Sequence, residues 1–239
     1  MKTVSVVIPA LNEEGNLPET LGTVVSVLEV AFEDYEIIAV DDGSTDRTAE
    51  IIASAAAANG RIRCVTHASP RGFGASYDAG RKLARMRYCV MVHGDNAFDE
   101  ETLRHFLSHA GKAQVVSGFI ENPASRSRMR RLISRLYTWS LNSLFRMNLR
   151  YFNGLQIHET NWLQGVNLRS QGFAFQAELL IRALRDGRTH LEIPYRHRER
   201  PGGGTSKLFR LRNIVSVFRT IALLHSDVPS HVSSPSGRG

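Results

Sequence analysis

The stretch that decides the fold is VSVVIPALNE, residues 4–13, a β-branched run that ends at a proline and leads into a polar loop. Apolar residues then recur at intervals of three and four residues from Leu17 to Leu28. The β-branched run predicts a buried strand, and the intervals predict an amphipathic helix. The sequence therefore opens with a strand, a loop and a helix.

The same order recurs along the chain. YEIIAVDDGSTDRT, residues 35–48, predicts a second buried strand and an acidic loop, and an alanine-rich helix is expected over 48–59. Further strands are expected at 62–66 and 88–92, with a helix over 75–86 between them. Strands that alternate with helices pair in parallel through right-handed crossovers. We therefore expect an α/β fold with a mostly parallel central sheet flanked by helices, and a ligand beyond the carboxyl ends of the strands.

The composition is that of a globular, enzyme-sized protein. The 239 residues are 42% hydrophobic and 22% charged, which excludes collagen-like, coiled-coil and wholly disordered chains. A net charge of +7 suits anionic partners such as nucleotides or membrane phosphates. No zinc spacing or aromatic RNA-binding signature supports nucleic-acid binding. The N-terminus lacks a secretory signal pattern and no apolar run is long enough to span a bilayer, so we expect a cytoplasmic protein that crosses no membrane.

Two further expectations concern the chain as a whole. We expect one domain over residues 1–225 and a disordered tail over 226–239, which is rich in Ser, Pro, Gly and Arg. Cys64 and Cys89 are too few for a disulfide framework and lie in apolar runs. Both thiols are therefore expected to be buried and reduced.

The second half of the sequence contains a basic amphipathic pattern. From Arg126 to Phe145, arginines alternate with leucines and aromatic residues, which predicts a C-terminal amphipathic helical region. Such a helix can lie on an anionic lipid surface, or it can pack its apolar side on the core and leave a solvated basic side. The pattern alone allows both. A further helix is expected over 173–184 and a strand over 191–195.

Acidic loops follow three of the expected strands. Asn12 and Glu13 follow the first, Asp41 and Asp42 the second, and Asp95 the fourth. Each loop alone is also explained by turn formation. Together they would lie at one edge of the sheet, where carboxylates can accept hydrogen bonds from ribose and base N–H groups and can hold a divalent cation.

In order and spacing these loops resemble the opening of the inverting family 2 glycosyltransferases with the GT-A fold. The similarity covers roughly residues 3–215, and the order of the later motifs resembles the dolichol-phosphate or polyprenyl-phosphate sugar synthases. These motifs are GFGA (72–75), HGD (93–95), FAFQAELL (173–180), EIP (192–194) and the segment from Glu199 to Lys207.

The resemblance implies an inverting transferase that moves a sugar from a nucleotide-diphosphate donor to a polyprenyl phosphate, assisted by Mg²⁺ or Mn²⁺. It would act as a peripheral protein at the cytoplasmic face of a membrane. By similarity the donor site would comprise Pro9, Asn12, Glu13, Asp41, Asp42 and Gly72. Asp95 would hold the metal and take part in catalysis together with Arg200 and Lys207, which with Ser206 would meet the diphosphate or the acceptor phosphate.

Four other residues have alternatives that the sequence leaves open. His93 replaces the first aspartate of the family's metal motif, so it either ligates the metal or leaves Asp95 as the only protein ligand. Glu178 either serves the substrate, as the best candidate for a general base, or hydrogen-bonds a loop. An acceptor phosphate is already anionic and needs no such base. Either Arg128 or Arg131 is expected to receive the polyprenyl phosphate.

Two rival functions remain compatible with the sequence. A transferase of the same class could use a soluble or cell-envelope glycan as acceptor. A non-catalytic nucleotide-sugar-binding subunit is the other rival, suggested by His93 and by Ala97, which stands where the lipid-phosphate branch often has a glutamine.

Overall fold

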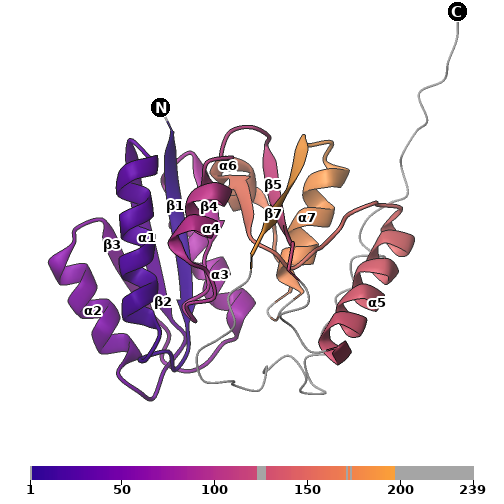
Figure 1. Ribbon diagram of the computed structural model, residues 1–239. Coiled ribbons are helices and arrows are strands. Elements are labelled where there is room, and N and C mark those ends of the chain that lie inside the picture. The colour runs from indigo at the N-terminus through magenta and orange to yellow at the C-terminus, as the bar shows by residue number, and fades with distance from the viewer. Residues whose placement is uncertain (1, 123–127, 171, 173, 197–239) are drawn as a thin grey trace, which may run out of the picture.

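The computed structural model describes residues 2–122, 128–170, 172 and 174–196 (Figure 1). These residues form a seven-stranded sheet in the order β3-β2-β1-β4-β6-β5-β7. The first four strands pair in parallel, as predicted. They are β1 (Thr3–Ala10), β2 (Asp34–Asp41), β3 (Ile62–Thr66) and β4 (Tyr88–Met91).

Strand direction reverses once in the other half of the sheet, at β6. β6 (Gln156–Glu159) is antiparallel to both β4 and β5 (Val115–Ile120), whereas β7 (His190–Tyr195) is parallel to β5. The sheet is therefore mostly parallel, with one antiparallel strand inside it. Sequence analysis did not predict β5 or β6; in β6 the four residues QIHE have little of the apolar character expected of a buried strand.

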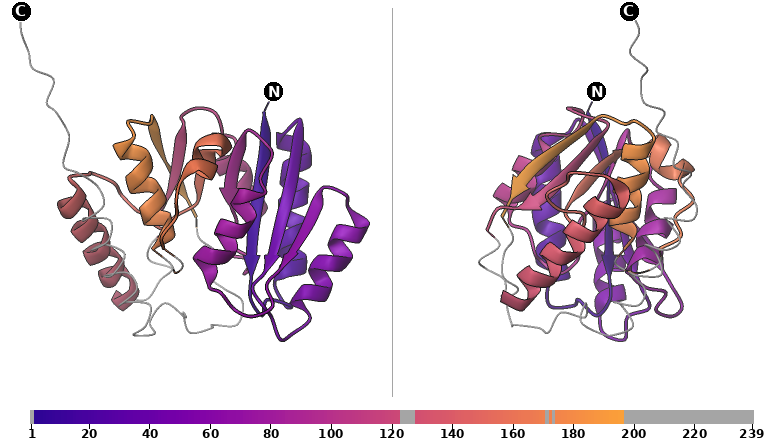
Figure 2. Two further views of the ribbon diagram at one scale, coloured as in Figure 1. Left: turned by 180° about the vertical axis from the view of Figure 1, so that it is seen from behind. Right: turned by 90° about the vertical axis from the view of Figure 1, so that its right-hand side faces the viewer.

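Helices cover both faces of the sheet (Figure 2). One face is packed by α1 (Leu17–Ala31), α2 (Thr48–Ala58) and α4 (Glu100–Leu107), and the other by α3 (Phe73–Lys82), α6 (Thr160–Gly165) and α7 (Phe175–Arg185). Alternation along β1 explains the two cores, because Val6 and Ile8 join the first and Val7 joins the second. Three layers result, and the predicted α/β class is confirmed.

The two cysteines differ in burial. Cys89 on the central strand β4 is fully buried, as predicted, and burial raises its pKa to about 12. Cys64 is exposed, so the prediction that it is buried is wrong. β3 is the edge strand of the sheet and its side chains alternate between packed and solvent-facing positions. An apolar sequence environment does not distinguish an edge strand from a central one.

The basic amphipathic helix is present as α5 (Arg128–Phe145), beside α7 at one end of the sheet (Figures 1 and 2). Its Leu141 and Phe145 are buried in a cluster with side chains of α7. No helix within the described ranges has both the length and the apolar character needed to cross a membrane. The expected tail, residues 226–239, lies outside the described residues.

Candidate functional site

The loops after β1 and β2 are joined by hydrogen bonds at the carboxyl ends of these strands. Asn12, in the left-handed region with φ 54°, accepts through Oδ1 from the Thr45 amide at 2.8 Å. Its own amide donates to Ser44 Oγ at 3.0 Å. The Glu13 amide donates to Thr48 Oγ1 at 2.9 Å, which adds a third link. The backbone at Asn12 and Glu13 is thereby fixed to the loop that contains Asp41 and Asp42.

The two aspartates at the end of β2 are both buried, with 1% and 3% of their surface exposed for Asp41 and Asp42. Asp41 Oδ1 accepts from the Ser44 amide at 3.1 Å, inside its own loop. Asp42 reaches the third loop instead: Oδ1 lies 3.0 Å from His67 Nδ1 and 2.9 Å from the Arg71 amide nitrogen, and Oδ2 lies 2.9 Å from the Gly72 amide nitrogen. Burial by itself raises the pKa of Asp42, but the hydrogen bonds from His67 and the backbone amides hold that pKa below its ordinary value.

His67 is the residue of this site that sequence analysis missed. It is 8% exposed and follows β3 directly, and its amide donates to the Asp41 carbonyl at 2.9 Å. The available signal was a histidine placed at the same strand end as the acidic loops. Nothing in the sequence shows that its ring turns toward Asp42 and not toward solvent.

The loop after β4 lies against the end of β1. A Cβ atom on Gly94 would lie 3.2 Å from the Pro9 carbonyl oxygen and 3.2 Å from Ala10 Cβ, so the two strand ends are in close contact. Thr20 Oγ1 donates to the Gly94 carbonyl and accepts from the Asn96 amide at 3.1 Å. Asp95, between these two residues, is 6% exposed. The predicted edge therefore brings Pro9 together with the loop that contains Asp95, next to the joined loops.

The residues available to a metal ion are few. His93 stacks on Phe73, with ring centroids 4.9 Å apart and planes inclined by 19°. No group of three or more His, Cys, Asp or Glu side chains with metal-binding geometry occurs among the residues that the structure describes. A carboxylate oxygen such as those of Asp95 suits a hard divalent cation. In the loop after β4, Asp95 and, as the alternative, His93 are the candidate metal ligands.

Glu178 occupies a different position from the acidic loops. Its side chain is fully buried on α7, and Oε2 accepts from the Ser170 amide at 2.8 Å. Oε1 accepts from the Arg169 amide at 3.1 Å and from Arg182 Nε at 3.0 Å. Both oxygens thus hold the segment before α7, which is the loop-binding alternative that the sequence left open.

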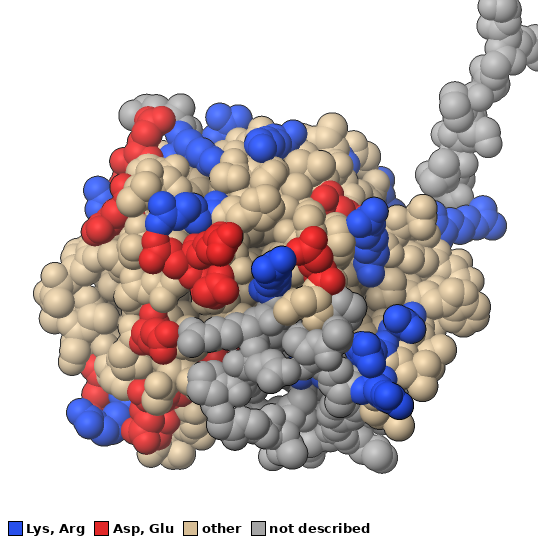
Figure 3. All heavy atoms as spheres, in the orientation of Figure 1, with Lys and Arg blue, Asp and Glu red and all other residues tan. Residues whose placement is uncertain are grey.

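The remaining predicted residues lie elsewhere. Arg128 is exposed and Arg131 half-buried at the start of α5, away from the hydrogen-bonded loops in sequence and on a separate helix. Basic side chains gather over α5 on the right of the molecule in Figure 3. Arg200, Ser206 and Lys207 are outside the described residues.

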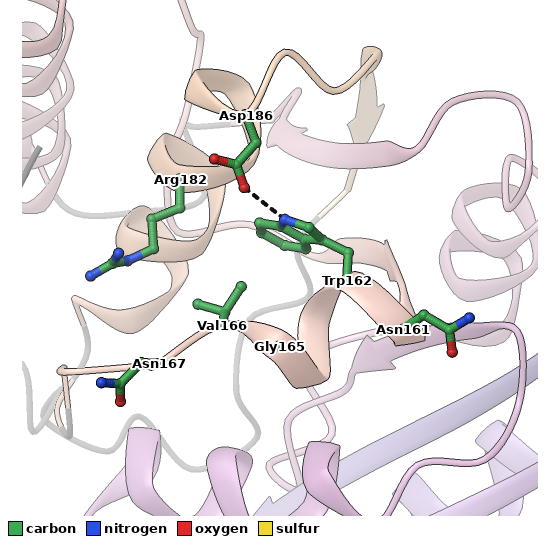
Figure 4. Close-up of a pocket in the computed structure, with 7 residues that line it drawn as sticks. All are labelled: Asn161, Trp162, Gly165, Val166, Asn167, Arg182 and Asp186. Carbon is green, nitrogen blue, oxygen red and sulfur yellow. Dashed lines mark hydrogen bonds between the residues drawn. The ribbon is translucent and has the colours of Figure 1, made fainter. Parts of the chain in front are cut away.

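A separate hollow of about 420 Å³ lies between α6 and α7 (Figure 4). Trp162 Nε1 donates to Asp186 Oδ2 there at 2.8 Å, and the indole ring also stacks on His158 with a centroid distance of 5.4 Å. The Arg188 guanidinium lies 5.0 Å from the ring centroid. The Trp162 ring is thus held by its neighbours, and the lining of the hollow includes none of the predicted site residues.

Comparison with known proteins gives a consistent result. Residues 5–168 match the family described as Glycosyl transferase family 2. The chain is 27% identical over 211 residues to the undecaprenyl-phosphate mannosyltransferase of Micrococcus luteus, covering 84% of this chain and 85% of that protein. It is 32% identical over 143 residues to the undecaprenyl-phosphate 4-deoxy-4-formamido-L-arabinose transferase of Aeromonas hydrophila, covering 59% of this chain but only 44% of that protein. The chain therefore spans less than half of the length of the second relative.

A solved structure supports the fold. Glucosyl-3-phosphoglycerate synthase from Mycobacterium tuberculosis, crystallised with Mn²⁺, uridine diphosphate and phosphoglyceric acid, superposes with a TM-score of 0.68 at 19% identity. The superposition covers 96% of this chain and 80% of that chain. The same enzyme was also crystallised with Mg²⁺ and uridine diphosphate.

Proposed function

The chain belongs to glycosyl transferase family 2, and on that premise we propose that it transfers a sugar from a nucleotide-diphosphate donor to a polyprenyl phosphate. The observation that carries the proposal is the set of polar loops joined at the carboxyl ends of β1, β2 and β4, where α/β sheets bind ligands. The names of the relatives from Micrococcus luteus and Aeromonas hydrophila support the acceptor class, since both act on undecaprenyl phosphate.

In this proposal the donor nucleotide lies over the edge formed by Pro9, Asn12, Glu13, Asp41 and Gly72. These residues belong to loops that are fixed before any ligand arrives, because each loop is hydrogen-bonded to its neighbour or closely packed against it. Prior ordering reduces the entropy that donor binding must otherwise lose.

A divalent cation, Mg²⁺ or Mn²⁺, offsets the charge of the donor diphosphate in this proposal. Asp95 supplies one carboxylate, and donor phosphates and water supply the other ligands. The stacking of His93 on Phe73 favours a packing role for this imidazole. Crystals of the structurally similar synthase with Mn²⁺ or Mg²⁺ and uridine diphosphate support the choice of cation.

The acceptor phosphate attacks the anomeric carbon of the donor sugar, with inversion, and the bond to the nucleotide diphosphate breaks. Because the acceptor oxygen is already anionic at neutral pH, this step needs no general base. Glu178 is therefore free to hold the segment before α7. Arg200, Ser206 and Lys207, which lie outside the described residues, remain candidates for the diphosphate and the acceptor phosphate.

Helix α5 provides the membrane contact in the proposal, at the cytoplasmic face. Within the described ranges, six of the eight exposed large hydrophobic side chains belong to α5. These six side chains are called the α5 apolar face: Met129, Leu132, Ile133, Leu136, Trp139 and Leu144. An exposed apolar face beside arginines suits an anionic lipid surface. In this proposal Arg128 or Arg131 receives the acceptor phosphate there.

The test of the activity is a transfer assay with undecaprenyl phosphate in detergent and a panel of UDP-, GDP- and CDP-linked sugars, with and without Mn²⁺. Formation of a lipid-linked sugar from one donor class is the expected result. Turnover only with soluble glycan acceptors would replace the acceptor class. Metal-dependent nucleotide binding without any transfer would favour a non-catalytic nucleotide-sugar-binding subunit.

A further inference from the structure

The carboxylate of Asp42 accepts three hydrogen bonds from inside the protein. With 3% of its surface exposed, the residue places Oδ1 at hydrogen-bonding distance from the His67 ring and the Arg71 amide, and Oδ2 at the same distance from the Gly72 amide. An ionised carboxylate has about four acceptor positions, and the protein fills three of them here. Most of the hydrogen-bonding capacity of Asp42 therefore serves the loop after β3.

His67 completes this arrangement from the end of β3. An ionised carboxylate only accepts hydrogen bonds, so the proton of the shared bond must be on His67 Nδ1. Ser76 Oγ, 3.4 Å from the same nitrogen, donates to the Gly72 carbonyl at 3.2 Å. The imidazole thus links the end of β2 to the first turn of α3.

The backbone held by this pair is unusual in two ways. Gly72 has φ 101°, which L side chains rarely adopt, and it precedes α3 without any side-chain cap. The loops also touch directly, since a Cβ on Gly43 would lie 2.7 Å from the Ser69 carbonyl carbon. The Arg71 and Gly72 amides both donate to Asp42. Their orientation therefore depends on one buried carboxylate.

We infer that His67 and Asp42 are positioning residues. They hold the Arg71–Gly72 backbone, before the donor nucleotide binds, in the conformation that the donor contacts. The inference rests on the proposed function for the identity of the ligand. It assigns a role to His67 and gives Asp42 the role of holding the loop after β3.

The test compares His67→Leu, which removes the hydrogen bond, with His67→Asn, whose Nδ2 can donate from nearly the position of Nδ1. His105→Leu, an exposed histidine on α4, is the matched control. Because a hydrogen bond to a charged group is lost, His67→Leu is expected to raise the donor KM about tenfold while kcat changes less than about twofold. His67→Asn and His105→Leu are expected to stay within about threefold of the wild-type KM.

Two results would overturn the inference. One is an unchanged donor KM in His67→Leu, even if the melting temperature falls, because the pair would then be only structural. The other is an equal rise of the donor KM in His67→Leu and His67→Asn, because the hydrogen bond would then not be the cause.

Hydrogen exchange without donor separates this inference from the proposed function. The Arg71 and Gly72 amides are expected to exchange faster in His67→Leu than in His67→Asn. If the wild type transfers no sugar, the proposed function fails, but faster exchange still supports the positioning role. Equal exchange in both variants would reject it.

Discussion

Asp42 and Leu132 are 3% and 53% exposed, the reverse of what their polarity would suggest. The first belongs to the loops at the carboxyl edge of the sheet, where carboxylates are buried and accept hydrogen bonds from backbone amides. The second belongs to the α5 apolar face, where leucines and a tryptophan are exposed. Buried charge requires partners inside the protein, whereas exposed apolar surface gains free energy only when something outside covers it. The two regions thus differ in where their partners are.

The variant Asp95→Asn should give the largest difference between transfer activity and vesicle binding. Removing the charge that the proposal assigns to the metal is expected to lower transfer at least about a hundredfold, while vesicle binding through α5 stays unchanged. Transfer assays and vesicle flotation measure the two effects, and the melting temperature reports folding. Transfer within tenfold of wild type would show that Asp95 does not hold the metal.

The α5 apolar face is tested by Leu132→Ser combined with Leu136→Ser. Each leucine loses apolar area that lipid would bury, so affinity for vesicles with anionic lipid is expected to fall at least about tenfold. Leu83→Ser is the matched control, because Leu83 is exposed but lies outside α5. Equal binding of the double variant and the control would remove the lipid contact from α5.

Tryptophan fluorescence gives an independent measurement of the same contact. Trp139 is 69% exposed, and the only other tryptophan of the chain, Trp162, is already hydrogen-bonded to Asp186. Anionic vesicles are expected to shift the wild-type emission to shorter wavelength, and Trp139→Phe should abolish the shift. A shift that persists in Trp139→Phe would contradict this prediction.

The opposite side of α5 is buried, so substitutions there should lower the free energy of unfolding. Leu141 is 1% exposed, so Leu141→Ala is expected to lower the free energy of unfolding by about 2–4 kcal/mol. Leu136→Ala, on the outward side, should change it by less than about 0.5 kcal/mol. Denaturant unfolding of both variants checks the difference. Similar losses would mean that the outward side is also packed inside the protein.

The smallest expected effect concerns the pH dependence of Asp42. Its pKa is lowered in the folded state, so its ionised form stabilises the fold above the unfolded pKa near 3.8 and this contribution is lost as pH falls through the folded pKa. The stability advantage of wild type over Asp42→Asn should therefore be constant from pH 7 to about 5 and shrink below about 4. Urea unfolding across this range measures it, and an advantage that grows toward acid would show the opposite sign.

The sequence predicts the first half of the fold well because local pattern and final environment agree there. VSVVIPALNE and YEIIAVDDGSTDRT form the central strands β1 and β2, and their loops do meet at one edge. β6 was missed because the pairing partners of QIHE come from strands far along the chain, and its polar residues are satisfied by tertiary contacts. Cys64 was wrongly predicted to be buried because a β-branched environment does not reveal an edge position.

In the candidate site, too, the sequence predicted which residues gather but not how they contact one another. Sequence motifs identified Asp41, Asp42 and Asp95, but motifs carry no information about which oxygen faces which amide. The link from Asp42 to His67 spans 25 residues, and only the folded backbone shows it. Likewise the basic pattern of α5 allowed two interpretations, and the pattern does not show that Leu132 and Leu136 are exposed whereas Leu141 is buried.

The two thiols described for β3 and β4 make the protein convenient to label. Cys89 is buried with a pKa of about 12, so a thiol-reactive dye at neutral pH should attach only to Cys64 among the two cysteines of the chain. Cys64 is three residues before His67 on the strand that leads into the Arg71–Gly72 loop. A dye at Cys64 therefore reports on the Arg71–Gly72 loop without any engineered cysteine.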